Sequence, residues 1–239
     1  MGIPKIIHYC WFGRGELTEK SRTCIESWSK VCPDYKIVRW DEDNFDVNCC
    51  DYVREAYETK HYAFVSDYAR FYAIKQMGGL YLDTDVEAIR PFDELLDTDV
   101  LISGKSVISD GFDVYGVTSG IIGSVKDSRF VDDMIARFHE HGLKKEDGSL
   151  DVTPVAKHMT DYLIAKGFAL DDSLQKKDGV TLYPCEYFCP RIDRDNNSEV
   201  LVTDETRTIH FFAQSWMTPE IHEILIEKLK NRKPGEIVG

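Results

Sequence analysis

The chain has 239 residues, of which 43% are hydrophobic and 30% are charged, and its formal net charge is −13 at pH 7. This length suits one large domain, and the composition is that of an ordinary globular protein rather than a disordered one. The negative charge disfavours nucleic acid as a partner, and the sequence contains no run of about 18 apolar residues that would predict a membrane-spanning helix.

The beginning of the chain and its cysteines bear on where the protein works. Residues 1–5 lead directly into a β-rich run and lack the long apolar region of a signal peptide. The seven cysteines are an odd number, and none of them forms a Cys-x-x-Cys pair, so we interpret them as reduced thiols rather than zinc ligands. A cytoplasmic location is therefore expected.

The first half of the chain alternates β-rich runs with helical patterns. Strands are predicted at 5–12, 35–40 and 80–82, and helices at 18–31 and 61–77. Gly78-Gly79 closes the second helix, as glycine often does at a helix end. The strand–helix–strand opening is typical of an α/β fold with a parallel sheet.

The sequence patterns that predict helices and strands are weaker beyond residue 90. Short strands are predicted at 100–102, 120–123, 179–183 and 208–212, and helices at 129–141, 154–166 and 219–230. We expect a single domain over 1–239, with 217–239 as a C-terminal helical tail packed on it. Because this tail carries a small cluster of cations, a peripheral contact with the inner face of a membrane is the alternative.

Asp83-Thr84-Asp85 is the most informative motif, because it directly follows the apolar strand at 80–82. In an extended chain the two carboxylates would share one side, at the strand end where open α/β sheets bind ligands. Carboxylates hold hard divalent cations, whose shell is commonly completed by water and substrate phosphates. The motif predicts metal-dependent chemistry on a phosphate-bearing ligand, although acidic pairs also occur in solvated turns.

Four further residues are candidates for the same site. Asp67 and Arg70 lie three residues apart on the helix before the motif, so their side chains are neighbours. They form either an ordinary intrahelical ion pair or contacts to sugar hydroxyls and phosphate. Trp11, at the end of the first strand, either stacks on a base or packs in the core. His210 is a structural histidine or a third metal ligand.

Three segments resemble glycosyltransferase family 32, which includes capsule and lipopolysaccharide transferases and yeast mannosyltransferases and is related to the clostridial glucosylating toxins. The central resemblance lies in Ala63-Phe64-Val65-Ser66-Asp67-Tyr68-Ala69-Arg70 and Gly78-Gly79-Leu80-Tyr81-Leu82-Asp83-Thr84-Asp85. The opening run at 3–13 and the closing segment at 209–216 are similar to the family's first strand and its His…Ser-Trp segment. The resemblance implies a GT-A fold, a Rossmann-like and mostly parallel sheet flanked by helices.

The resemblance also implies a role for each matching residue. Trp11 would stack on the base, Asp67 and Arg70 would hold the ribose and sugar, and Asp83 and Asp85 would bind Mn²⁺ or Mg²⁺. His210 would be a further metal ligand. The expected catalytic residues are Asp83, Asp85 and Arg70, and the expected nucleotide-sugar contacts are Trp11, Cys10, Asp67, Arg70, Tyr81, Ser119, Ser215 and Trp216. An Asn that the family often carries near Ser119 is absent here.

The expected activity is the metal-dependent transfer of a hexose from a nucleotide-sugar with retention of configuration. The expected donor is UDP-galactose or UDP-glucose. The expected acceptor is a saccharide or a lipid-linked oligosaccharide in bacterial surface polysaccharide synthesis. GDP-mannose as donor and a non-catalytic nucleotide-sugar-binding module are the alternatives. A phosphatase of the haloacid-dehalogenase type also ends a strand with Asp-x-Asp, but it requires Thr where this chain has Glu87.

Overall fold

A seven-stranded sheet with the order β2-β1-β3-β6-β5-β8-β7 forms the centre of the computed structural model, which describes residues 2–109, 112–140, 142–145, 149–193 and 199–213. Its strands are β1 (Ile6–Cys10), β2 (Lys36–Trp40), β3 (Gly79–Leu82), β5 (Val100–Ser109), β6 (Phe112–Ser124), β7 (Gln175–Lys177) and β8 (Val180–Tyr183). Strands β1, β2, β3, β5 and β8 point one way, while β6 and β7 oppose them. The mostly parallel α/β sheet that the sequence predicted is confirmed.

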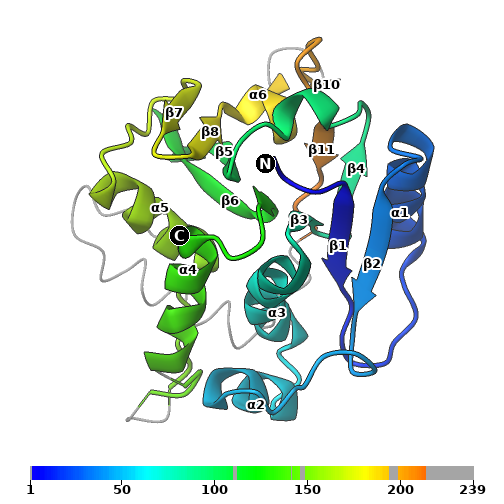
Figure 1. Ribbon diagram of the computed structural model, residues 1–239, viewed down its shortest axis with the longest axis vertical. Helices are drawn as coiled ribbons and strands as arrows, with labels where there is room; N and C mark the ends of the chain where they lie inside the picture. The colour runs from blue at the N-terminus through cyan, green and yellow to red at the C-terminus, as the bar shows by residue number, and fades with distance from the viewer. Residues whose placement is uncertain (1, 110–111, 141, 146–148, 194–198, 214–239) are drawn as a thin grey trace.

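Helices cover both faces of this sheet (Figure 1). They are α1 (Glu19–Val31), α2 (Asp51–Glu58), α3 (Tyr62–Met77), α4 (Arg129–Glu140), α5 (Val155–Ala165), the short α6 (Cys185–Phe188) and the 3₁₀ turn η1 (Asp93–Leu95). One apolar core lies between the sheet and α2 to α5, and a second lies on the face of α1, η1 and α6. Burial on two faces explains the continuous apolar runs of the central strands.

The ends of two helices are fixed by local chemistry. Thr18 caps α1, because its side chain accepts a hydrogen bond from the backbone N–H of Ser21. Helix α3 ends at Gly78, where φ is +65°, and Gly79 follows with φ of +111°. These left-handed conformations favour glycine, so the glycine pair both stops the helix and turns the chain directly into β3.

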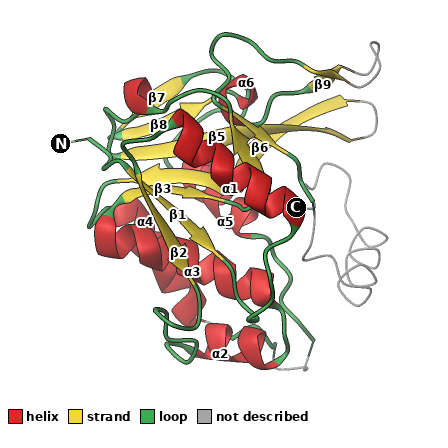
Figure 2. Ribbon diagram, turned by 90° about the vertical axis from the view of Figure 1, so that its right-hand side faces the viewer, coloured by secondary structure: helices red, strands yellow, loops and turns green. Residues whose placement is uncertain are grey.

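The structure departs from the prediction at several elements in both halves of the chain. Strands β5 and β6 are much longer than the predicted runs and pair as a hairpin that extends away from the helices (Figure 2). Helix α2 and strand β4 (Val86–Ala88) were not predicted, nor were the short β9 (Ile192–Asp193) and β10 (Glu199–Val200). Strand β11 (Thr208–His210) stops at His210 rather than at residue 212. The tail at 217–239 lies outside the described residues.

None of the helices within the described ranges is both long enough and apolar enough to cross a bilayer.

Candidate metal and nucleotide-sugar site

Asp83-Thr84-Asp85 forms a turn between β3 and β4. The motif is therefore not extended, as it would have to be for strand geometry to place both carboxylates on one side. The backbone N–H of Val86 donates to the carbonyl of Asp83 at 3.0 Å, and the N–H of Asp83 donates to the carbonyl of Gly120 at 2.8 Å. The turn and the neighbouring strand β6 therefore fix where the two carboxylates point.

His210 reaches the motif through a small two-stranded sheet. Strand β11 pairs antiparallel with β4 and places His210 opposite Val86. The Nε2 atom of His210 lies 3.3 Å from Oδ1 of Asp85. Asp83, Asp85 and His210 each offer one ligand atom, and these three atoms all lie within 4.8 Å of one another. Two carboxylates and an imidazole are a ligand set that suits Mn²⁺. The structure thus brings the three predicted metal ligands together.

Gly120 leaves room for this cluster. A Cβ atom at this position would lie 2.6 Å from Oδ2 of Asp83 and 2.7 Å from Cε1 of His210, closer than real Cβ contacts. The two side chains can therefore approach each other only because residue 120 has none. This fit supports a metal centre rather than a solvated acidic turn.

The charges of Asp85 and His210 are coupled. Burial alone would lower the pKa of His210, but its contacts with Asp85 and Cys189 raise that pKa to about 10. The pKa of Asp85 is lowered, because His210 and the backbone N–H of Ala213 outweigh the effect of burial. At neutral pH the metal-free site is therefore an imidazolium–carboxylate pair, and binding a metal at His210 would displace a proton.

Arg70 is a buried cation beside the metal cluster. Its guanidinium pairs with Asp67 at 2.6 Å, lies 3.8 Å from Oδ1 of Asp83 and donates to the carbonyl of Ser119 at 2.6 Å. It also lies over the ring of Tyr81, 4.7 Å from the centroid. A buried charge needs such partners, so the position of Arg70 is strongly determined.

Tyr81 and Cys10 lie close to this ion pair. The hydroxyl of Tyr81 donates to Oδ1 of Asp83 at 2.9 Å, which holds that carboxylate towards the cluster. Both side chains are buried, and burial raises the pKa of Cys10 well above its usual range. Their expected contacts with the nucleotide-sugar stay predictions.

Asp67 shares this apolar environment. Burial raises its pKa to about 6, with Arg70 lowering it and Asp83 raising it. A carboxylate that titrates near neutrality beside a candidate metal centre is typical of a functional site.

Trp11 follows β1 and is half-buried, with its indole N–H donating to the carbonyl of Gly15 at 2.8 Å. One edge of the ring is therefore fixed by its own loop, while part of the side chain is accessible to a base. Base stacking stays a prediction. Ser119 is half-buried and contacts Arg70 through its carbonyl, so a sugar contact by its side chain is also untested. Ser215 and Trp216 lie outside the described residues.

Lys105 and the stacking of Phe212 on His210 were not predicted from the sequence, although the closing segment itself was. The ring of Phe212 stacks on His210 with centroids 3.9 Å apart, and the Nζ atom of Lys105 lies 4.6 Å from the centroid of Phe212. Burial lowers the pKa of Lys105, and no carboxylate of the described residues pairs with it. No motif marks this lysine, which the long β5 strand brings to the site.

Comparisons with known proteins agree with this geometry. The family model described as the glycosyltransferase sugar-binding region containing the DXD motif matches residues 18–102. Inositol phosphoceramide mannosyltransferase 3 of Schizosaccharomyces pombe is 32% identical over 122 residues, which are 49% of this chain and 34% of that protein. Over residues 18–102 the chain matches this DXD glycosyltransferase family. The resemblance to family 32 is confirmed, and the chain matches about a third of the length of that curated relative.

Two solved structures share the fold. PaToxG glycosyltransferase has a TM-score of 0.50 and 15% identity, covering 69% of this chain and 70% of that one. A glycosyltransferase involved in the glycosylation of the major capsid of PBCV-1 has a TM-score of 0.52 and 12% identity, and the match covers 87% of this chain and 93% of that one. The GT-A fold is confirmed. The family match at 18–102 includes Asp67, Arg70, Asp83 and Asp85 but not His210, which the tertiary structure adds.

Proposed function

We propose that this DXD glycosyltransferase is metal-dependent and moves a hexose from a nucleotide-sugar to a saccharide acceptor with retention of configuration. The convergence of Asp83, Asp85 and His210 carries the proposal. These side chains come from a turn and from a distant strand, and Gly120 leaves the space that their approach needs.

Asp83, Asp85 and His210 would hold Mn²⁺ or Mg²⁺. When bound there, the ion supplies positive charge that stabilises the developing negative charge of the diphosphate leaving group. Arg70 and Lys105 add two fixed cations in a chain that is otherwise strongly acidic. Asp67 accepts hydrogen bonds from sugar hydroxyls, and Trp11 stacks on the base. We name no side-chain nucleophile.

The donor that we propose is a UDP-hexose, UDP-galactose or UDP-glucose. GDP-mannose is the second candidate, and the relative named as a mannosyltransferase favours it. The acceptor is a saccharide or a lipid-linked oligosaccharide in the synthesis of a bacterial surface polysaccharide. The single-domain organisation, the cytoplasmic location and a peripheral contact of the tail with the membrane belong to the same proposal.

A donor screen tests the proposed function. UDP-galactose, UDP-glucose and GDP-mannose are each incubated with the protein, with Mn²⁺, with Mg²⁺ or with excess EDTA, and the released nucleotide is measured. We expect metal-dependent release from one donor. Tight binding of a donor with no release, with and without saccharides, would instead favour the non-catalytic module.

A further inference from the structure

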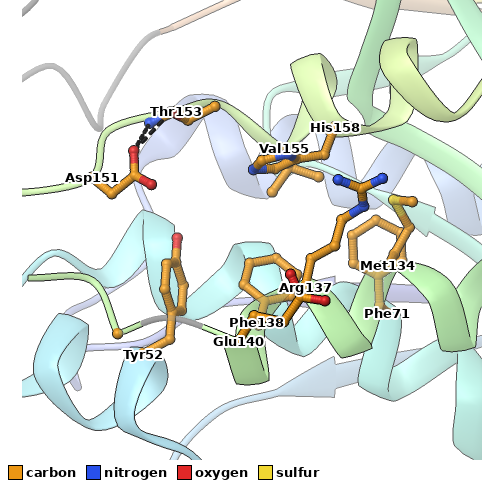
Figure 3. A pocket seen from close by; sticks show the side chains of 11 residues that line it. Tyr52, Phe71, Met134, Arg137, Phe138, Glu140, Asp151, Thr153, Val155 and His158 are labelled. Carbon is orange, nitrogen blue, oxygen red and sulfur yellow. Dashed lines mark hydrogen bonds between the residues drawn. The ribbon is translucent and has the colours of Figure 1, made fainter. Parts of the chain in front are cut away.

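A cavity of about 220 Å³ lies among α2, α3, α4 and the segment at 151–158 (Figure 3). Its apolar wall includes the rings of Tyr52, Phe71 and Phe138, together with Met134 and Val155. Its polar groups are Arg137, Glu140, Asp151 and His158. None of these residues belongs to the metal cluster or was singled out by the sequence.

The cavity adjoins the Asp67–Arg70 ion pair. Phe71 lies one helical turn after Asp67 on α3, so both project from the same side of that helix. The buried Tyr52 lines the cavity and is also close to the ion pair: besides burial, the nearby charges of Asp67 and Asp151 raise the pKa of its hydroxyl, and Arg70 lowers it. Tyr52 therefore belongs to the cavity lining and also lies close to the residues proposed to hold the donor sugar.

The lining combines the two kinds of contact that a sugar ring needs. Aromatic rings pack against its C–H faces, while carboxylates and a guanidinium hydrogen-bond its hydroxyls. The rings of Tyr52 and Phe138 are fixed edge to face, with centroids 4.9 Å apart. The volume is below the roughly 300–1,000 Å³ of pockets for drug-sized ligands, so it suits one sugar ring rather than an oligosaccharide.

The polar groups are held in defined positions. One oxygen of Asp151 accepts from the backbone N–H and the hydroxyl of Thr153, at 3.1 and 2.7 Å. Burial and the charge of Arg137 lower the pKa of His158, so its neutral imidazole can both donate and accept at neutral pH. Arg137 and Glu140 are exposed residues of α4 that line the cavity, and the guanidinium of Arg137 extends towards the side of His158 (Figure 3).

We propose that this cavity binds the terminal sugar ring of the acceptor, with Arg137 and Glu140 as its specificity-determining contacts. The inference rests on the proposed function, since it assigns the second substrate of the same reaction. The acceptor hydroxyl would approach the donor sugar from the side of Tyr52 and Asp67.

The test measures saccharide and nucleotide binding separately. Methyl glucopyranoside, galactopyranoside and mannopyranoside are titrated by ligand-observed NMR into the protein with UDP and Mn²⁺ present, and UDP binding is followed by calorimetry. The variants are Arg137→Gln and Glu140→Gln. Arg129→Gln is the matched control, because Arg129 lies on the same helix, is exposed and is outside the cavity.

We expect at least one glycoside to bind, and its affinity to fall about tenfold or more in Arg137→Gln and Glu140→Gln, the effect of losing a charged hydrogen bond. Its affinity should be unchanged in Arg129→Gln, and UDP affinity unchanged in all three. The inference is overturned if Arg137→Gln binds the glycoside as tightly as the wild type does. It is also overturned if the wild type binds UDP but none of the glycosides. A protein that binds glycosides at the cavity but neither binds UDP nor releases nucleotide retains the saccharide site and refutes the proposed function.

Discussion

The Nε2 atom of His210 lies 3.3 Å from Oδ1 of Asp85, and the other oxygen of Asp85 accepts from the backbone N–H of Ala213 at 2.7 Å. Both carboxylate oxygens are therefore engaged by the segment at 210–213, which consists of the last residue of β11 and the residues directly after it. This segment comes from the far end of the described chain, and the pairing of β4 with β11 brings it to the motif. Any ion that binds Asp85 must share it with these groups, so metal binding and the position of the closing segment are coupled.

Replacing Asp85 with Ala should abolish transfer while the fold persists, because Asp85 is the carboxylate that contacts His210. Asp83→Ala should lower turnover less, since the contact between Asp85 and His210 does not involve Asp83. Nucleotide release from the donor, measured with Mn²⁺ and after chelation, checks this order, and circular dichroism checks the fold. Full activity in excess EDTA would refute metal dependence.

Gly120→Ala should weaken binding of Mn²⁺ by at least tenfold, because the added methyl group would lie 2.6 Å from Asp83 and 2.7 Å from His210. Overpacking of this kind typically also reduces the free energy of unfolding by about 1–3 kcal/mol. Gly116→Ala is the control, because it lies on the same strand and its Cβ would have its nearest neighbour at 3.9 Å. Equal metal affinity in the two variants would show that the cluster does not bind the ion.

Trp11→Ala should weaken binding of UDP, measured by calorimetry with Mn²⁺ present, by about ten- to a hundredfold, since a stacked base contributes ~1–3 kcal/mol. Trp11→Phe keeps an aromatic face without the indole N–H that bonds to Gly15, and should retain much of the affinity. If Trp11→Ala binds UDP as the wild type does, Trp11 acts in packing alone.

Lys105→Met should weaken binding of the nucleoside diphosphate about tenfold, because it removes a half-buried cation over the ring of Phe212, which stacks on His210. The effect on the nucleoside without phosphates should be small, since Lys105 is proposed to interact with the phosphates. Lys30→Met, at an exposed lysine of α1 that pairs with Glu26, is the control. Equal losses for diphosphate and nucleoside would point to a packing role for Lys105.

Donor binding should weaken as the pH falls through about 6, the pKa of Asp67. Because this folded-state pKa is above the ordinary 3.8, the native state takes up the proton before the unfolded state does. Protonation of Asp67 therefore raises the free energy of unfolding as the pH falls from about 6 to about 4, so the lost binding is not unfolding. Calorimetry with the donor nucleotide-sugar and thermal melts at each pH distinguish weaker donor binding from unfolding. The Asp67→Asn variant should not lose donor affinity as the pH falls through about 6.

The sequence determined much of the first half of the chain. The strand–helix–strand opening, the helix at 61–77 and its glycine stop follow from local periodicity and turn chemistry, and the structure matches them closely. Asp67, Arg70, Asp83 and Asp85 were found together because a helix, a glycine pair and a short strand connect them within nineteen positions. The strand reasoning for Asp83 and Asp85 was wrong, because the motif is a turn, although the two carboxylates still converge.

Tertiary structure decided the rest of the site, because its partners are set by strand pairing across long stretches of sequence. His210 was an open alternative until β11 paired with β4, and Gly120 had no visible role until β6 lay against Asp83. Lys105 and the cavity at Tyr52 and Arg137 carry no sequence motif, since each depends on which elements pack side by side. Local sequence fixes which residues form a helix, strand or turn, whereas the long-range packing of those elements fixes which side chains meet.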